Sequence, residues 1–374
     1  MKKLIAVMLL LSAALWPLAC GKSLTPTSTS LSNLTPTATV HVSGYYVSTL
    51  AGQTSSGYID AVGVAAKFDY PHGCTVDSAG NVYVADLDNN VIRKINPTTG
   101  AVTTIAGSGS GTDSDNANAL LAGFNGPHFL AVDSNQNIYV TDTYGDTIRV
   151  ITAGGAVSTL AGSGSQGSSN NSNGLLATFH YPYGIAVDGS GNVYVTDANN
   201  NLLREISPTG SVSTLAGSGS QSTVDGTGTS ASFDHPTGLC LDNTGNYLYV
   251  SDTYSGMIRK VTISSGAVTT LAGGGYGQAT NGIGNAAKFD EGQGLATDKN
   301  GNIYYADRSD EEIRMITPAG VVTTVAGNDN GGDRNGPGYL ATFSNPMGVA
   351  VDSNGVIYVS DSGNNLIRNI VYQQ

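Results

Sequence analysis

One phrase recurs six times along this chain of 374 residues, and that repetition constrains its fold more than any other feature. The phrase reads VSTLAG or a close variant. Its copies begin at six evenly spaced valines: Val47, Val102, Val157, Val212, Val268 and Val322. A second phrase places an aspartate seven residues before an arginine in every copy. The period is about 55 residues, and the copies fill nearly all of the chain after residue 44.

Each copy contains four strand-like runs. In the copy that starts at Gly184 they read GIAVD, NVYVTD, LLREI and VSTLAG, and turns rich in Gly, Asn, Pro and Ser separate them. Four antiparallel strands per repeat make one blade of a propeller. The sequence therefore predicts an all-β fold, a six-bladed β-propeller over residues 45–374.

The two ends of the repeat region are incomplete in complementary ways. The region begins with a lone fourth strand, Tyr45–Gly52, and ends with the first three strands of a unit, Gly348–Val371. We expect the N-terminal strand to complete the C-terminal blade and so close the ring. Closure removes an open sheet edge that would otherwise invite aggregation.

The full repeat reads FxxPxGxAVDxxGNxYVxDxxNxxIRxI in its commonest form. This pattern resembles NHL repeats, and it covers nearly the whole region after residue 44. The fifth copy departs most, with Gly292 where the others have Pro and Thr297 where the others have a larger apolar residue. The resemblance implies a propeller but no single activity, because such propellers include binding scaffolds, sensor domains and a few lyases.

The N-terminus is typical of a secreted lipoprotein. Residues 1–19 combine Lys2 and Lys3 with a short apolar stretch, as in a signal peptide. The signal ends at Cys20, in a context that resembles the bacterial lipobox with its Leu one place late. We expect lipidation at Cys20, with residues 20–44, rich in Ser, Thr and Pro, as a flexible tether. The alternative is an ordinary cleaved signal. Gly21 favours the outer membrane of the bacterial cell envelope.

Charge excludes one class of partner. The formal net charge is −12, and no basic cluster is present. Since nucleic-acid affinity comes mostly from Lys and Arg that neutralise phosphates, we expect no nucleic-acid binding.

The residues that stay constant in all copies are most economically explained as scaffold. The aspartate can cap the turn that follows it, and the arginine can pair with an aspartate of its own or a neighbouring blade. The six pairs are Asp86/Arg93, Asp142/Arg149, Asp197/Arg204, Asp252/Arg259, Asp307/Arg314 and Asp361/Arg368.

A second constant position carries Asp or Asn six residues before the Ala of the A-x-F phrase. Its members are Asp60, Asn116, Asn171, Asp225, Asn281 and Asn335. Side chains of this type bond their own backbone in turns or cap helices such as the segment 118–122. Calcium is the alternative, because the loops are rich in Gly and oxygen ligands, although no loop gathers several carboxylates.

Residues that vary on this constant frame are better candidates for function. They lie after the constant Phe, after the constant Pro and in the loops between strands two and three. Antiparallel strands bring these positions to one face, at the mouth of the central channel. The candidate ligand-binding residues are His72, His128, Tyr183, His180, His235, Asp234, Glu291, Gln293, Tyr144, Tyr254 and Arg308.

Two functions are compatible with this face. The first is a non-enzymatic binding or assembly module whose ligand is a protein, a glycan or a small molecule. The second is a hydrolase or lyase, with or without Zn or Ca, built from the histidines, Tyr183 and a carboxylate such as Glu291. The repeats contain no G-x-S-x-G elbow and no zincin helix. We expect the first function, with no cofactor.

Overall fold

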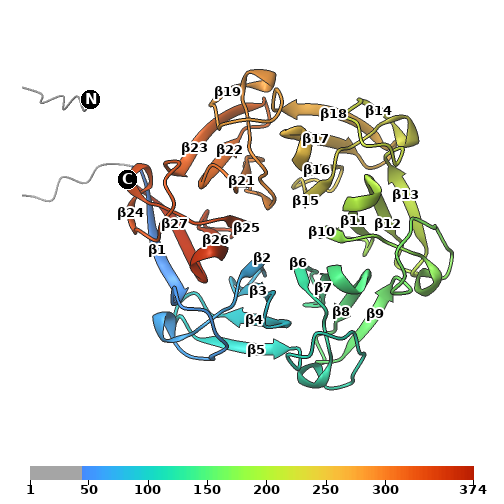
Figure 1. Cartoon of the computed structure of the whole chain (residues 1–374), viewed down its shortest axis with the longest axis horizontal. Coiled ribbons are helices and arrows are strands. Elements are labelled where there is room, and N and C mark those ends of the chain that lie inside the picture. Colours follow the sequence, from blue (N-terminus) through green and yellow to red (C-terminus); the bar gives the residue numbers. More distant parts are fainter. Residues whose placement is uncertain (1–43) are drawn as a thin grey trace, which may run out of the picture. The chain divides into compact units, whose positions relative to one another are not determined.

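The computed structural model describes residues 44–374, which form six antiparallel sheets around a central axis (Figure 1). Each sheet is one blade, so the predicted six-bladed, all-β propeller is confirmed. Within the described range the helical elements are ten short 3-10 turns, and no helix is long and apolar enough to cross a membrane. The proposed signal peptide, Cys20 and most of the tether lie outside the described residues.

The strands follow the same order in every blade. The innermost strands are β2 (Pro71–Val76), β6 (Pro127–Val132), β10 (Pro182–Val187), β15 (Pro236–Leu241), β20 (Leu295–Thr297) and β25 (Pro346–Val351). The second strands are β3 (Val82–Asp86), β7 (Ile138–Asp142), β11 (Val193–Asp197), β16 (Tyr247–Asp252), β21 (Ile303–Asp307) and β26 (Ile357–Asp361).

The third strands are β4 (Val91–Ile95), β8 (Thr147–Ile151), β12 (Leu202–Ile206), β17 (Met257–Thr262), β22 (Glu312–Ile316) and β27 (Leu366–Gln373). The fourth strands of blades one to five are β5 (Val102–Ala106), β9 (Val157–Ala161), β13 (Val212–Ala216), β18 (Ala267–Ala272) and β23 (Val321–Gly327).

The fourth strand of blade six comes from the other end of the chain. Strand β1 (Gly44–Gly52) pairs antiparallel with β27, and Ser48 lies opposite Asn369. The first and last described strands thus lie side by side (Figure 1). The predicted closure of the ring is confirmed.

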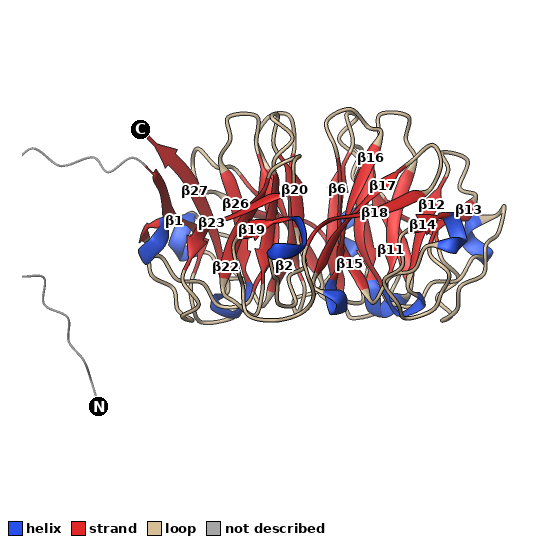
Figure 2. Cartoon of the chain, turned by 90° about the horizontal axis from the view of Figure 1, so that it is seen from above, coloured by secondary structure: helices blue, strands red, loops and turns tan. Residues whose placement is uncertain are grey.

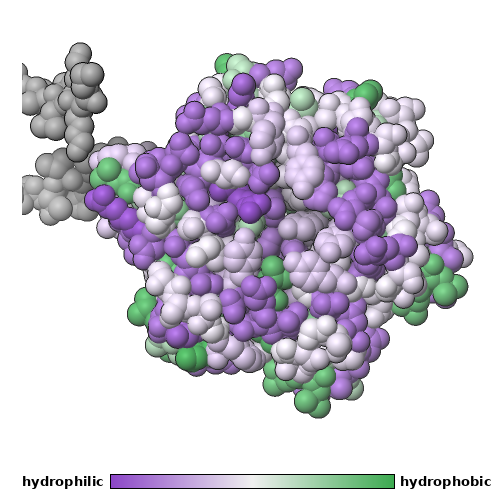
Figure 3. All heavy atoms as spheres, in the orientation of Figure 1, coloured by the Kyte–Doolittle hydropathy of each residue, from purple (hydrophilic) through white to green (hydrophobic). Residues whose placement is uncertain are grey.

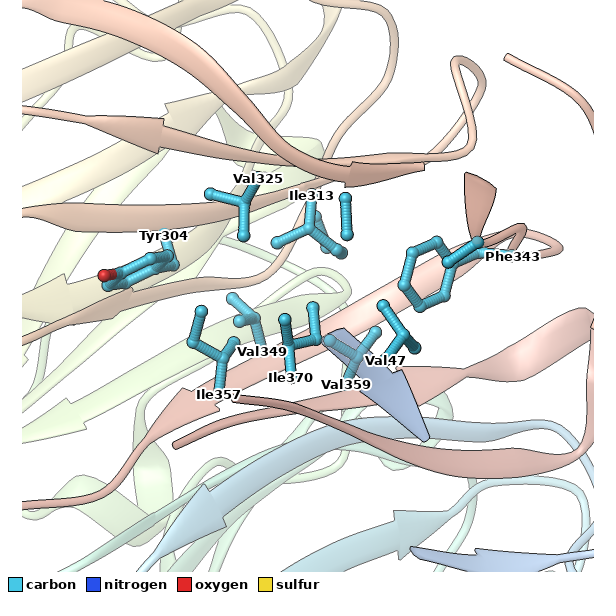
Figure 4. Close-up of a cluster of buried hydrophobic side chains, with 12 residues drawn as sticks. Val47, Tyr304, Ile313, Val325, Phe343, Val349, Ile357, Val359 and Ile370 are labelled. Carbon is cyan, nitrogen blue, oxygen red and sulfur yellow. The ribbon is translucent and has the colours of Figure 1, made fainter. Parts of the chain in front are cut away.

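The core consists of apolar side chains packed between neighbouring blades. Between blades five and six, Val47 of β1 packs with residues such as Ile313, Phe343 and Ile370 (Figure 4). All four of these side chains are fully buried. The closing strand therefore contributes to the core as well as to hydrogen bonding, and burial of each such side chain stabilises by about 1.5–3 kcal/mol.

Three blades carry a short fifth strand that the sequence did not predict. These strands are β14 (Gly226–Thr227), β19 (Gly282–Ile283) and β24 (Gly336–Pro337), and each pairs with the outermost long strand of its blade. In blades one to three, single bridges such as Val62 to Ala101 take the same place. The incoming loop thus covers the outer edge of each sheet, which protects it from pairing with another chain.

The two faces of the ring differ in what they display. Innermost strands begin, and second strands end, on the face that we call the mouth face; loops cover both faces (Figure 2). On the opposite face the turns are internally bonded: Asp77, for example, accepts the backbone N–H groups of Ala79 and Asn81. The mouth face is the one on which the variable side chains gather.

Candidate functional site

The six constant arginines all form buried ion pairs inside their own blades. The guanidinium nitrogen and the carboxylate oxygen lie 2.5 to 3.0 Å apart, and both side chains of each pair are 0% exposed. The sequence left open a partner aspartate in a neighbouring blade, and that alternative is wrong for every copy. The observed pairs are Arg93 with Asp86, Arg149 with Asp142, Arg204 with Asp197, Arg259 with Asp252, Arg314 with Asp307 and Arg368 with Asp361.

Each of these arginines also lies over the constant phenylalanine of its blade, a contact that the sequence did not predict. The distance from the guanidinium carbon to the ring centroid is between 4.9 and 5.6 Å, which is within the range of a cation–π interaction. The contacts join Arg93 to Phe68, Arg149 to Phe124, Arg204 to Phe179, Arg259 to Phe233, Arg314 to Phe289 and Arg368 to Phe343.

Hydrogen bonding of the arginines is incomplete at one atom. Nε of all six is buried and has no hydrogen-bond partner among residues 44–374. In Arg314 this atom lies 3.4 Å from the carboxylate of Glu312. Because the six side chains are fully buried and line no part of the mouth pocket described below, they belong to the scaffold and do not contact a ligand.

The aspartate of each pair also positions a loop. In blade one, the other oxygen of Asp86 accepts the backbone N–H of Asp69. Asp69 begins the loop that carries the variable residues of that blade. The buried pair therefore fixes the start of this loop.

The second constant position is a partner of the same arginines. Asp60, Asp225, Asn281 and Asn335 accept from the guanidinium groups at 2.7–2.9 Å. In blades two and three the preceding residues, Asp115 and Asn170, make this contact in place of Asn116 and Asn171.

The cause is one extra residue before the A-x-F phrase in these two copies. It leaves Asn116 and Asn171 to accept the backbone N–H groups of Asn118 and Asn173. Asn118 in turn caps a 3-10 turn through the N–H of Leu120, as the sequence predicted for this segment. In the other four blades the oxygens of the second constant position face a guanidinium, a cation that competes with calcium for the same oxygens.

Two tiers of side chains surround the mouth of the channel. The inner tier is the residue after the constant Pro: His72, His128, Tyr183, Thr237, Gln293 and Met347. All of these except the half-buried Tyr183 are buried. The outer tier is the residue before that Pro, or before Gly292 in blade five: Tyr70, Gly126, Tyr181, His235, Glu291 and Asn345. All six outer-tier residues have a left-handed backbone, with φ between 47° and 70°.

In the inner tier, His72, His128 and Tyr183 of blades one to three form one aromatic cluster. The ring centroids of His72 and His128 are 4.6 Å apart, and those of His128 and Tyr183 are also 4.6 Å apart. The Tyr183 hydroxyl lies 3.4 Å from Nε2 of His72. Nδ1 of His128 lies 2.8 Å from the carbonyl oxygen of Gly126, so Nδ1 carries the proton and donates it there.

Burial keeps both imidazoles neutral. It lowers the pKa of His128 to about 4, and it lowers the pKa of His72 well below its ordinary value, with a smaller contribution from neighbouring His128. Burial also raises the pKa of the Tyr183 hydroxyl. The cluster is therefore uncharged at neutral pH.

A pocket of about 190 Å³, which we call the mouth pocket, opens beside this cluster. The rings of His235 and Tyr254 stack at 4.4 Å with an interplanar angle of 11°. Arg308 donates to Glu291 at 3.2 Å and to Asn345 at 3.3 Å. The mouth face viewed along the axis is largely hydrophilic, with a few apolar atoms near the centre (Figure 3). The pocket walls come from blades three, four and five and consist of Tyr183, His235, Thr253, Tyr254, Glu291, Gln293 and Arg308.

Blade five supplies three of the lining residues, and it is the copy that departs most from the repeat. Gly292 replaces Pro because a Cβ there would lie 2.2 Å from the ring of Tyr305. Tyr305 stands where the other blades have Val, and its hydroxyl bonds Ser251 of blade four at 3.1 Å. The departures of this copy thus form one connected group. At the position of Arg308 the other copies carry Leu87, Thr143, Ala198, Thr253 and Ser362.

Not every predicted site residue reaches the pocket. Tyr144 packs on His128 and Tyr181 outside it, at 5.1 and 5.7 Å between ring centroids. His180 lies beside Asn199, and Asp234 lies on the loop of His235 without lining the pocket.

The sequence predicted that the positions of Tyr70, Tyr181 and Asn345 lie on this face but did not single these residues out as candidates, and it missed the lining residue Thr253. One signal was present: Gly126 and Asn345 are the residue types that tolerate positive φ best, and they occupy this position in two copies. In residues 44–374, no group of three or more His, Cys, Asp or Glu side chains is arranged to hold a metal ion.

Three family models match parts of the chain. The NHL repeat matches residues 124–151 and 343–368, the SMP-30/Gluconolactonase/LRE-like region matches residues 184–328, and the Beta-propeller repeat matches residues 167–196. Among curated proteins, NHL repeat-containing protein 2 of Bos taurus is 29% identical over 71% of this chain and 41% of its own length. Protein SUPPRESSOR OF QUENCHING 1, chloroplastic, of Arabidopsis thaliana is 28% identical over 67% of this chain and 25% of its own length. The chain thus spans less than half of these relatives.

Solved structures share the fold at low identity. An auxiliary nutrient binding protein of Bacteroides thetaiotaomicron has a TM-score of 0.70 and 16% identity over 89% of this chain and 78% of that chain. A gluconolactonase of Xanthomonas campestris has a TM-score of 0.57 and 15% identity over 87% and 89% of the two chains. With six in-phase repeats, a closed ring of four-stranded blades and these matches, the chain belongs to the NHL-repeat β-propellers.

Proposed function

We propose that this propeller is a non-enzymatic binding module of the bacterial cell envelope and that it holds its ligand in the mouth pocket. The observation that carries the proposal is the convergence of blade five. Glu291 and Gln293 at the variable positions and Arg308, the one charged residue among six at its position, line the same pocket, while Gly292 and Tyr305 depart from the repeat in the scaffold behind them. The scaffold positions that are constant in the other five blades are thus altered in the blade that supplies most charge to the pocket.

The chemistry of the cluster supports binding over catalysis. A nucleophile or general base works best with a pKa near the operating pH. Here burial moves the pKa of Tyr183 upward and that of His128 to about 4, both away from neutrality. Solved propellers of this fold include proteins described as nutrient-binding and as a streptogramin B lyase, so the fold itself is compatible with both functions.

The location at the envelope rests on the N-terminal sequence. In this proposal residues 1–19 are the signal peptide, Cys20 carries the lipid and residues 20–44 are the tether, with the outer membrane as the site. Substitution Cys20→Ala tests it. We expect the variant to be released from membranes on fractionation, whereas unchanged membrane association and processing would contradict the anchor.

A binding screen with product analysis tests the function. The full chain is screened by thermal shift against oligosaccharides, peptides and nucleotides, and each hit is titrated by calorimetry. We expect saturable binding of an unaltered ligand, weakened at least tenfold by Arg308→Ala and unaffected by Arg334→Ala, a matched exposed arginine of an outer loop. Chemical conversion of the hit that disappears in His128→Ala would favour the lyase or hydrolase instead.

A further inference from the structure

The outer tier is strained where it carries large side chains. A left-handed backbone suits Gly and Asn, which blades two and six have there as Gly126 and Asn345. The scaffold does not require larger side chains at this position, because two blades do without them. Backbone strain of this kind clusters at active sites and ligand-binding sites. Blades one, three, four and five place Tyr70, Tyr181, His235 and Glu291 in the same conformation, at φ of 51°, 57°, 55° and 51°.

The pocket beneath this rim has no net charge. Its two ionic residues, Arg308 and Glu291, pair with each other at 3.2 Å. Burial lowers the pKa of His235, so its imidazole is neutral, and the remaining lining residues are uncharged. A strongly anionic ligand would meet one compensated cation, and a strongly cationic ligand would meet Arg308 in the pocket wall.

The pocket contains both a hydrogen-bond acceptor and hydrogen-bond donors, and together they indicate which polar group of a ligand would fit. Gln293 is 7% exposed, and its Oε1 has no hydrogen-bond partner among residues 44–374. An unsatisfied buried acceptor costs free energy, and a donor group of a ligand in the pocket would remove that cost. Arg308 uses Nη1 and Nε for Glu291 and Asn345, and within the described part of the chain Nη2 makes no bond, so it offers donors. A hydroxyl group both donates and accepts, and therefore satisfies the two residues together.

Aromatic surfaces complete the site. Tyr254, 49% exposed, stacks on His235 and lines the pocket, and Tyr183 forms part of another wall. Flat, partly exposed rings bind the apolar C–H faces of a polar ring-shaped ligand at low entropic cost.

On these grounds, and resting on the binding function proposed above, we propose that the mouth pocket binds a neutral, polyhydroxylated ligand of the saccharide class. The outer-tier residues His235 and Glu291 shape the site directly, and Tyr70 and Tyr181 extend the contact surface across blades one and three.

Calorimetry with three length-matched series of oligosaccharides tests this inference on the full chain. The series are neutral (cellohexaose, maltohexaose and mannohexaose), anionic (oligogalacturonate) and cationic (chitosan oligomers). We expect at least one neutral member to bind saturably, with Kd raised at least tenfold by Gln293→Leu and by Tyr254→Ala. Tyr339→Ala, which removes an exposed tyrosine of an outer loop, serves as the control and leaves Kd unchanged.

The strained backbone of the outer tier allows a second, independent test. Tyr70→Asn and Tyr181→Asn replace a strained residue by the type found in blade six, so we expect weaker binding with a melting temperature that does not fall. A fall in melting temperature without a change in Kd would overturn the role of the outer tier.

Two other results separate the ligand class from the function. Binding confined to a charged series or to a peptide, and still weakened by Gln293→Leu, overturns the saccharide inference but leaves the binding function in place. If no series binds saturably, the saccharide inference is overturned. If a series binds but none of the mouth variants changes its Kd, the saccharide inference is overturned and the mouth pocket is not the binding site.

Discussion

At the scale of single residues, each buried arginine joins three parts of its blade. Arg204 binds Asp197 at 2.6 Å, binds Asn170 of the incoming loop at 2.8 Å and lies over the ring of Phe179 at 5.1 Å. Burying such a pair costs desolvation, so its net contribution to stability is small compared with the cost of breaking it. The pairs therefore act mainly to specify how loop, hairpin and phenylalanine fit together.

Removing the arginine alone measures the cost of breaking the pair. We expect Arg204→Met to lower the free energy of unfolding by about 3–5 kcal/mol, because Asp197 is left buried without its cation. Urea denaturation measures the change, with Glu205→Gln, a partly exposed neighbour on the same strand, as the control. A loss below about 1 kcal/mol for Arg204→Met would show that water or another residue replaces the guanidinium.

The buried histidines make stability depend on pH. The folded protein holds the pKa of His128 at about 4, whereas the unfolded chain has a value near 6.5. Below pH 6.5 the unfolded chain takes up a proton that the folded protein refuses, so this residue lowers stability as the pH falls from 6.5 toward 4.

A variant isolates this contribution from that of the many carboxylates. His128→Asn keeps a donor for Gly126 but does not titrate. Between about pH 7.5 and pH 5 we expect wild type to lose about 2 kcal/mol of unfolding free energy relative to the variant, as measured by urea denaturation at each pH. An equal loss in both proteins would mean that His128 is protonated in the fold.

At the scale of elements, the seam between β1 and β27 determines whether the propeller is a ring or an open row of blades. Repeats of this kind contact only their neighbours, so without the seam blade six lacks its fourth strand and Val47 leaves the core. Sequence reasoning located this seam because incomplete ends are visible in the repeat phase. It did not find the short strands β14, β19 and β24, since two-residue pairings follow from where a loop lies and leave no periodic pattern.

A disulfide across the seam tests its contribution. Ser48 and Asn369 are partly exposed, lie directly opposite each other and come from neighbouring antiparallel strands, a spacing that suits a disulfide. We expect Ser48→Cys with Asn369→Cys to gain about 2–4 kcal/mol when oxidised, since the bridge closes a very long loop, and to lose that gain on reduction. If the oxidised and reduced forms have the same melting temperature in thermal unfolding, the ring opens first at a place other than the seam.

At the scale of the whole molecule, the sequence allowed prediction of the ring and of the face on which the variable residues gather, but not of the pocket. Equivalent positions of six repeats must lie around one axis. Because His72 and His128 occupy the same position in adjacent repeats, the sequence predicted that they lie on a common face. Which variable residues share a cavity depends on side-chain length and local backbone. Arg308 reaches Glu291 and Asn345, whereas His180, from the loop that precedes the innermost strand of blade three, lies outside the pocket.

The central claim is that ligand binding occurs at the mouth face of the ring. Hydrogen–deuterium exchange of the full chain, with and without a ligand from the binding screen, tests it most directly. We predict slower exchange in residues 69–72, 180–183, 234–237, 290–293 and 308–311, and no change in the opposite-face turns 77–81 and 133–137. Protection confined to the opposite-face turns or to the outer loops would contradict the claim.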